Sequence, residues 1–372
     1  MNSIRVKPQD LAVIVRPRAE NTLEVATAML RISLADPQAA AHLQEMFWFW
    51  PEQEPISFER AFSGLDFLVS VLYLKSLDWL CRRHLRRSFQ KEVSNLRGRV
   101  KGKILIGQNV RSNFPLSKLD HVWCSYQTHS MDTPPNRVLR TALEQARRCL
   151  HRAGITDLSV VLNWLAACHA TLDPVPLTRI ELNDVSRIAP RAAIDRPYKE
   201  PLRLARMVLA LLGSDPTTDR LGEAPKVPPF AIDMNELFER YCEARMRRRY
   251  PQLEAFYRDR NLGTKLMVRP DFIIPAQAGA CGVVVDAKYK YQWNQKEDRQ
   301  DVYQLLAYSR HGGVLSRLHE QPERQIRLLV LYPSETDTAA NNAALNLDDA
   351  TREFPEDLSN VEFYTKQVAL PR

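Results

Sequence analysis

Two apolar runs joined by a short turn dominate the last third of the sequence. Residues 268–274 and 282–288 each have the length of a strand and are rich in valine and isoleucine, and the turn between them contains Pro275 and Gly279. This pattern predicts an antiparallel hairpin. The order of the surrounding elements predicts an α/β domain in which a mixed sheet is flanked by helices. These elements are helices at 234–250 and 298–309 and strands at 326–332 and 361–364.

The first 225 residues have a mainly helical pattern with a few short strands. Apolar residues at near-helical spacing predict one long helix over residues 57–90. Residues 213–229 are rich in Pro, Gly, Asp and Thr, which is the composition of a linker. We therefore expect two domains, residues 1–225 and residues 226–372. The other elements expected in the first domain are helices at 136–152, 155–171 and 197–213 and strands at 11–15 and 103–106.

The composition favours a nucleic-acid partner inside the cell. The 372 residues include 52 Lys and Arg against 44 Asp and Glu, a net charge of +8 that attracts phosphate, although many basic proteins bind no nucleic acid. None of the six cysteines lies in a CxxC pair or at zinc-ligand spacing from a histidine, which indicates reduced thiols in a cytosolic protein. The sequence has no signal-peptide core at its N-terminus and no apolar stretch that could span a bilayer. We therefore expect a cytoplasmic protein without a membrane partner.

Asp271, Asp286 and Lys288 form the combination with the clearest chemistry. Side chains alternate along a strand, so Asp286 and Lys288 project from the same face, and the hairpin brings Asp271 alongside. Carboxylates supply the hard oxygen ligands that Mg²⁺ prefers, and a lysine can orient a water, so the set can hydrolyse a phosphodiester. The alternative is a salt bridge at a strand end, which is the commoner meaning of an isolated Asp-x-Lys.

The helices on either side of the hairpin carry further polar residues. Glu239 is either an additional metal-shell carboxylate or an exposed side chain. Gln304 shares a helix face with Asp301 and Tyr308, and either touches the water or substrate phosphate or faces solvent. Four arginines at the end of the first helix could grip a DNA backbone or face water: Arg245, Arg247, Arg248 and Arg249.

At these residues the sequence resembles the PD-(D/E)xK nuclease core of McrC, the endonuclease subunit of the McrBC 5-methylcytosine restriction system. Each block is moderately specific, and their number and order strengthen the likeness. The blocks within the second domain are 233–239 (DMNELFE), 269–272 (RPDF), 284–290 (VVDAKYK) and 301–308 (DVYQLLAY). Two more lie in the first domain, 96–99 (LRGR) and 132–137 (DTPPNR).

The resemblance implies a restriction-endonuclease-like core in residues 226–372, preceded by a domain that faces a partner or DNA. It implies that Asp271, Asp286 and Lys288 are catalytic, and by extension Glu239 and Gln304. It also implies that Asp271, Asp286 and Glu239 hold Mg²⁺, for which Mn²⁺ can substitute.

The resemblance further implies that the chain cuts DNA as part of a hetero-oligomer with a GTP-driven AAA+ subunit, McrB-like, whose ring centre McrC engages through its N-terminal part. The chain itself has no GxxxxGK[ST] motif. Two alternatives stay open: an inactive nuclease-fold adaptor that stimulates a motor, and an autonomous DNA repair nuclease.

Overall fold

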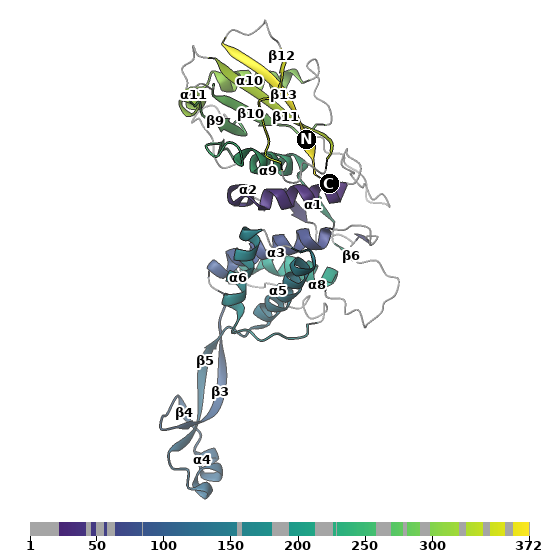
Figure 1. Cartoon of the computed structure of the whole chain (residues 1–372). Coiled ribbons are helices and arrows are strands. Elements are labelled where there is room, and N and C mark those ends of the chain that lie inside the picture. Colours follow the sequence, from purple (N-terminus) through teal and green to yellow (C-terminus); the bar gives the residue numbers. More distant parts are fainter. Residues whose placement is uncertain are drawn as a thin grey trace. The chain divides into compact units, whose positions relative to one another are not determined.

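The computed structural model forms two compact units, shown in Figure 1. The sheet unit comprises Met1–Phe49, Phe62–Leu65 and Phe230–Arg372, and the arm unit comprises Trp50–Ala61 and Asp66–Pro229. The structure describes residues 22–41, 46–49, 56–57, 64–83, 85–154, 158–180, 193–212, 226–227, 229–257, 269–277, 281–290, 298–319, 325–337, 343–353 and 360–371. The predicted strand at 11–15 and most of the predicted linker at 213–229 lie outside these residues.

The sheet unit is built on a six-stranded mixed sheet with the order β12-β13-β11-β10-β9-β8. Strands β10, β11 and β13 are parallel to one another, while β9, β8 and β12 run antiparallel to their neighbours. This confirms a mixed sheet with flanking helices, and the antiparallel pairing of β9 with β10 confirms the predicted hairpin. The strands are β8 (Glu254–Ala255), β9 (Phe272–Ile274), β10 (Val283–Ala287), β11 (Ile326–Thr336), β12 (Thr351–Glu353) and β13 (Val361–Leu370).

Two helices, α10 (Arg299–Ser309) and α11 (Gly312–Leu318), connect β10 to β11. A crossover is required because β10 and β11 are parallel and cannot be joined by a tight turn. Apolar side chains of both helices and of four strands form one buried cluster, which includes Ile273, Val284, Leu305, Leu328 and Phe363. This cluster fixes the helices on the sheet and so fixes the polar residues at the end of β10.

Helix α9 (Met234–Arg247) begins at Asp233, whose carboxylate accepts hydrogen bonds from the backbone N–H groups of Asn235 and Glu236. Helices α1 (Thr22–Leu34) and α2 (Pro37–Ala41) contact α9, and β1 (Phe47–Phe49) pairs with β7 (Phe230–Ile232). The structure therefore differs from the expected 1–225 domain at its N-terminal end. Residues 22–49 belong to the sheet unit because their packing and strand partners come from residues after 229.

The helices of the arm unit are α3 (Leu65–Arg82), α5 (Pro134–Arg152), α6 (Ser159–Leu172) and α8 (Lys199–Leu212), with a 3₁₀ segment at Ala193–Tyr198 and a strand pair, β2 (Ile56–Ser57) with β6 (Lys226–Val227). Helix α5 begins at Thr133, whose side chain caps Asn136 N, and it buries an apolar stripe against α6 and α8. The predicted helices at 136–152, 155–171 and 197–213 are confirmed with small shifts of their ends. Among the described helices none is both long and apolar enough to cross a bilayer.

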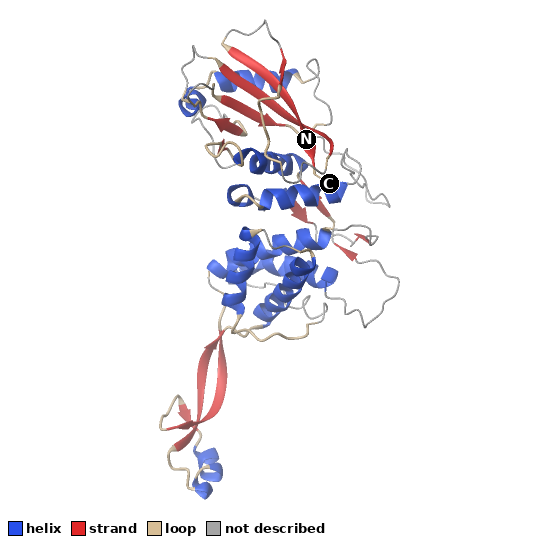
Figure 2. Cartoon of the chain, in the orientation of Figure 1, coloured by secondary structure: helices blue, strands red, loops and turns tan. Residues whose placement is uncertain are grey.

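A long two-stranded arm leaves these helices, as Figures 1 and 2 show. Strands β3 (Ser88–Arg97) and β5 (His121–Ser130) pair over their whole length, and the far end carries β4 (Lys103–Ile104), α4 (Ile106–Ser112) and the 3₁₀ segment η2 (Phe114–Leu116). The prediction of a single helix over 57–90 was wrong at both ends: residues 56–57 and 88–97 are strands. The predicted strand at 103–106 is shorter, since Ile106 starts α4.

Candidate active site

The hairpin of β9 and β10 brings two acidic residues together in the interior of the sheet unit. Val285 pairs with Phe272, so Asp286, next along β10, lies beside Asp271, which immediately precedes β9. Asp271 Oδ2 accepts a 2.7 Å hydrogen bond from the backbone N–H of Ala287. Both carboxylates are buried, with 7% and 1% of the surface of Asp271 and Asp286 exposed. The structure therefore places these two predicted residues side by side.

Lys288 lies against the same carboxylate pair. Its Nζ is 2.8 Å from Asp286 Oδ2, so the salt bridge considered as an alternative is present. That ion pair leaves Asp286 Oδ1 buried with no hydrogen-bond partner among the described residues. Buried carboxylate oxygens are normally satisfied, because losing water without a replacement partner is costly. A salt bridge alone therefore does not account for Asp286.

The pKa shifts at the site reflect crowded negative charge. Burial, with Glu239 and Asp286 adding to it, raises the pKa of Asp271 well above its usual range, although Lys288 and the Ala287 N–H oppose the shift. Burial also raises the pKa of Asp286 despite the opposing charge of Lys288. Burial would lower the pKa of Lys288, but Asp286 and Asp271 outweigh it and raise that pKa. The two carboxyls therefore keep a proton more readily than isolated ones, and a cation bound between them would oppose this by favouring their ionised forms.

The residues present fit a hard divalent cation such as Mg²⁺. Asp271 and Asp286 supply carboxylate oxygens, and Asp286 Oδ1 needs a partner. Mg²⁺ commonly binds one or two carboxylates and takes its other ligands from water and substrate phosphate. Within the described part of the chain no three His, Cys, Asp or Glu residues form a metal-binding group. A cation at this carboxylate pair would need further ligands from water or substrate.

Glu239 lies on α9, which packs against β10, and among the described residues it does not join Asp271 and Asp286 in a three-ligand group. Its Oε2 accepts a 3.2 Å hydrogen bond from Arg240 Nη2. Burial, Glu236 and Asp286 raise the pKa of Glu239 to about 7, while Arg240 and Arg269 oppose the shift. The Glu239 side chain is only 15% exposed, so of the two expectations for Glu239 the fully exposed side chain agrees less well with the structure.

Gln304 lies on α10 and is half-buried. Its Nε2 donates to the Tyr308 hydroxyl, which in turn donates to the backbone carbonyl of Arg269 at 3.0 Å. The predicted shared face of Asp301, Gln304 and Tyr308 is consistent with this bond and with the burial of Asp301 and Tyr308. Gln304 is thus tied to the segment that precedes Asp271, and its contact with water or phosphate stays a prediction.

Two cationic residues near the site were missed by reasoning from the sequence. Lys290 Nζ bridges Asp298 Oδ1 at 2.7 Å and Asp301 Oδ2 at 2.6 Å, which joins the end of β10 to the start of α10. Arg240 binds three glutamates of its own helix. The available signals were the second lysine, two positions after Lys288, and the i,i+3 and i,i+4 spacing of Glu and Arg along α9.

The arginines at the end of α9 do not act as one DNA-facing group. Arg245 is buried and donates to the Tyr241 hydroxyl and to the carbonyls of Ala343 and Ala369. Arg247 binds Glu243 at 2.8 Å. Of the four, only Arg248 and Arg249 are exposed, and Arg249 pairs with Asp348. Of the four arginines, only Arg248 and Arg249 are therefore exposed enough to contact DNA, and that contact stays a prediction.

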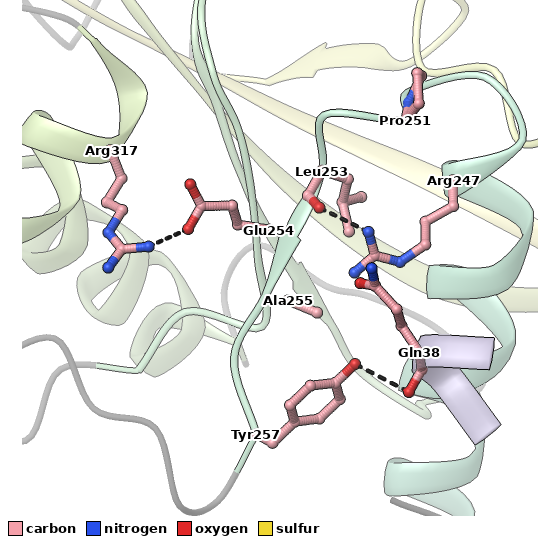
Figure 3. Close-up of a pocket in the computed structure, with 8 residues that line it drawn as sticks. All are labelled: Gln38, Arg247, Pro251, Leu253, Glu254, Ala255, Tyr257 and Arg317. Atoms are coloured by element: carbon pink, nitrogen blue, oxygen red, sulfur yellow. Dashed lines mark hydrogen bonds and ion pairs between the residues drawn. The ribbon is translucent and has the colours of Figure 1, made fainter. Parts of the chain in front are cut away.

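An open cavity of about 350 Å³ lies elsewhere in the sheet unit, and Figure 3 shows its lining. Its polar residues include Gln38, Arg247, Glu254, Tyr257 and Arg317, and the figure shows Arg247 bonded to the Leu253 carbonyl and Arg317 to Glu254. None of the residues predicted to be catalytic or to bind metal lines it. We therefore place the candidate active site at the carboxylate pair, where the buried Asp286 Oδ1 lies beside Asp271 and Lys288 without a hydrogen-bond partner among the described residues, and not at this cavity.

Fold and site define an α/β protein that carries a buried carboxylate pair and an adjacent lysine on one hairpin of a mixed sheet. The model of the family described as "McrBC 5-methylcytosine restriction system component" matches residues 9–316. That match covers most of the chain, and the chain belongs to this family.

Two solved structures from Thermococcus gammatolerans are similar to the chain. One is a half-complex of McrB AAA+ hexamers with bound McrC, at 17% identity and a TM-score of 0.35, covering 93% of this chain and 70% of that one. The other is the McrBC complex, at 18% identity and a TM-score of 0.34, covering 59% of this chain and 56% of that one. No curated protein matches the sequence.

Proposed function

We propose that the chain is the nuclease subunit of a restriction system, a metal-dependent endodeoxyribonuclease with a PD-(D/E)xK core in its sheet unit. The observation that carries the proposal is the buried Asp286 carboxylate, beside Asp271 and Lys288, with an oxygen that no described residue satisfies. Membership of a restriction-system family supports DNA as the substrate. Since such a system acts on DNA inside the cell, we place the protein in the cytoplasm.

Each residue of the site has a distinct part in this proposal. Asp271 and Asp286 would hold Mg²⁺ or Mn²⁺, with Asp271 fixed by the Ala287 N–H. The bound cation would stabilise the charge that builds on the scissile phosphate. Lys288, kept protonated by Asp286 and Asp271, would donate a hydrogen bond that orients the attacking water. Glu239 would contribute to the site without binding the cation directly.

The first test compares the wild-type chain with an Asp286→Ala/Lys288→Ala double variant on plasmid DNA, with Mg²⁺ or Mn²⁺. An Asp348→Ala variant is the matched control, since Asp348 is an exposed carboxylate paired with Arg249 on the surface. Under any condition in which the wild type cleaves, with or without the motor, we expect the control to cleave equally and the double variant not to cleave. Equal cleavage by the double variant would reject the site.

The same assay, repeated with the cognate AAA+ GTPase and GTP, separates the remaining alternatives. A restriction subunit should cut only, or far faster, when the motor hydrolyses GTP. An autonomous repair nuclease should cut equally well without it. An inactive adaptor should stimulate GTP hydrolysis and never cut, under any combination of metal and partner.

The arm unit offers a surface for the motor. At the end of the arm, side-chain amides are buried and apolar side chains are exposed. In an ordinary small domain the apolar side chains are the buried ones. Asn113 is 1% exposed, and its Nδ2 contacts Asn95 Oδ1, Asn109 Oδ1 and the His121 carbonyl at 2.8–3.0 Å. The apolar side chains that stay exposed at this tip are Val100, Ile104, Ile106, Val110, Phe114, Leu116 and Leu119.

Exposed apolar residues on a preformed scaffold mark a protein-binding surface. The tip also carries exposed cations, Arg99, Lys101, Lys103, Arg111 and Lys118. We assign this surface to the AAA+ GTPase subunit, because a family of system components needs a partner and the chain has no P-loop motif of its own. The hetero-oligomer would then use the arm for docking and the sheet unit for cutting.

A pair of charge substitutions tests this docking. Leu116→Asp/Leu119→Asp places two carboxylates on the tip, while Leu177→Asp changes another exposed leucine of the arm unit, outside the arm. We expect the tip variant to lose binding to the GTPase and stimulation of GTP hydrolysis, and the Leu177 variant to keep both. Loss in neither variant, or equal loss in both, would reject the tip as the docking surface.

A further inference from the structure

Arg240 is an arginine of α9 with only 1% of its surface exposed. Its guanidinium donates to Glu236 Oε1 at 2.7 and 3.1 Å and to Glu243 Oε2 at 2.8 Å. The Nη2 that binds Glu236 also donates to Glu239 Oε2 at 3.2 Å. One cation thus binds three carboxylates that lie on a single face of the helix, at i−4, i−1 and i+3.

Stability alone is a weak reason for such a cluster. Burying ionic groups costs solvation, and well-packed apolar side chains of similar volume often replace buried ion pairs without loss. An apolar stripe would therefore be enough to pack α9 against its neighbours. Glu236, Arg240 and Glu243 are nevertheless all nearly inaccessible, at 5%, 1% and 0% exposure.

The cluster extends to the candidate site through Glu239. Helix α9 packs against β10, and the Phe238 ring lies 5.7 Å from the ring of Tyr289, the residue that follows Lys288. Glu239, next to Phe238, is therefore near the end of β10, and its charge helps to raise the pKa of Asp271. Arg240 binds Oε2 of Glu239, which leaves Oε1 as the oxygen able to receive a water from that region. We therefore take Glu239 as the member of the α9 cluster that serves the site.

The guanidinium is itself held in place from the other side. The Tyr257 ring covers it at 4.3 Å, and the Tyr257 hydroxyl donates to Glu243 Oε1 at 2.9 Å. Arg247 donates to the same oxygen at 2.8 Å and to the Leu253 carbonyl at 2.8 Å, a bond drawn in Figure 3. Arg240 therefore has neighbours on its flank and on one face that restrict its position.

We infer that Arg240 is a positioning residue of the candidate site, which orients Glu239 so that its free oxygen accepts a hydrogen bond from a water on the cation held by Asp271 and Asp286. Carboxylates placed behind metal ligands typically tighten metal binding by tenfold to a hundredfold. The inference rests on the proposed function, since it requires a cation at the carboxylate pair. Arg240 itself touches neither the cation nor the DNA.

The test measures Mn²⁺ binding to the full-length chain by titration calorimetry, a readout that does not depend on cleavage. Arg240→Lys keeps the charge but shortens the reach and removes the fork that binds several carboxylates at once. The matched control is Arg245→Lys, another buried arginine of α9, which binds a hydroxyl and two carbonyls instead of Glu239. We expect Arg240→Lys to weaken Mn²⁺ binding about tenfold and Arg245→Lys to leave it unchanged.

A double-mutant cycle separates positioning from a general structural role. If Arg240 acts through Glu239, then Glu239→Gln should weaken Mn²⁺ binding, and adding Arg240→Lys should weaken it little further. Additive effects, or unchanged binding in Arg240→Lys, would overturn the inference. Should Arg240→Lys lose its helical circular dichroism, Glu236→Gln/Arg240→Gln removes one charge of each sign and takes its place with the same expectation.

The experiment distinguishes failure of the proposed cation site from failure of the proposed role of Arg240. If wild type and Asp286→Ala bind Mn²⁺ equally, or neither binds it, the cation site and with it the proposed function are rejected. If Asp286→Ala alone loses binding while Arg240→Lys keeps it, the proposed function stands and the role of Arg240 is rejected.

Discussion

Replacing Asn113 by alanine should open the tip of the arm while the rest of the arm unit stays folded. Asn113 Nδ2 contacts three acceptors, and Asn113 Oδ1 accepts from Asn95 Nδ2 at 2.9 Å. Two amide hydrogens serve three acceptors, so we count two donated bonds and one accepted bond. At about 1 kcal/mol net for each bond, the closed tip would lose about 3 kcal/mol relative to the open one.

Hydrogen exchange measures this loss directly. About 1.4 kcal/mol corresponds to a factor of ten, so amides in residues 98–121 should exchange on the order of a hundredfold faster in Asn113→Ala. Amides of α5 should be unaffected. The neighbouring Phe114 supplies the control, since its side chain is 59% exposed. Phe114→Ala should leave exchange unchanged and still weaken binding to the GTPase.

Faster exchange in Asn113→Ala would show that the buried amides hold the tip in shape. Unchanged exchange with weaker binding in Phe114→Ala would show that the apolar surface binds the partner. Unchanged protection of residues 98–121 in Asn113→Ala would refute the polar core. Faster exchange in both variants would mean that the apolar side chains, and not the amides, hold the tip together.

Three further predictions concern the site and the base of the arm. Because burial raises the pKa of Glu239 from 4.5 to about 7, the folded chain binds this proton more tightly, and without metal it loses stability as pH rises between those values. In chemical denaturation, the free energy of unfolding of Glu239→Gln should then exceed that of the wild type by about 3 kcal/mol at pH 8 and by nothing near pH 4. An equal difference at both pH values would count against the shift. Lys288→Met should cut DNA at least about a hundredfold more slowly yet bind Mn²⁺ at least as tightly in calorimetry, because the ammonium no longer competes for Asp286; weaker binding would make Lys288 part of the metal site. Asn136→Ala removes bonds to the carbonyls of Arg86 and Met131 and from the Tyr198 hydroxyl, so unfolding of the arm unit should need about 3 kcal/mol less, whereas a change below about 1 kcal/mol would contradict this.

The sequence predicted the sheet unit well because its elements bury large apolar surfaces. The valines of β10 and the turn after β9 defined a hairpin, and the hairpin was enough to bring Asp271 beside Asp286. The cap at Asp233 defined the start of α9. Patterns of this kind involve residues that are close together in the chain, so they can be recognised in a single sequence.

The arm was missed because it lacks such a pattern. Most residues of β3 are exposed or half-buried, so the strand shows no alternation of buried and exposed side chains. The pairing of β1 with β7 was missed for a different reason: these strands lie far apart in the sequence, and neither is longer than three residues. Arg240 and Lys290 were overlooked because charged residues on a predicted helix or strand end usually face solvent.

The measurement that tests the central claim most directly uses Asp286→Asn, which keeps the shape of the side chain and removes its charge. Mn²⁺ binding by calorimetry and plasmid cleavage with the GTPase, GTP and Mg²⁺ would be followed on the same preparations, with circular dichroism to confirm folding. We predict that the folded variant loses both metal binding and cleavage. A folded Asp286→Asn chain that still binds Mn²⁺ and cuts DNA like the wild type would contradict the assignment of this site.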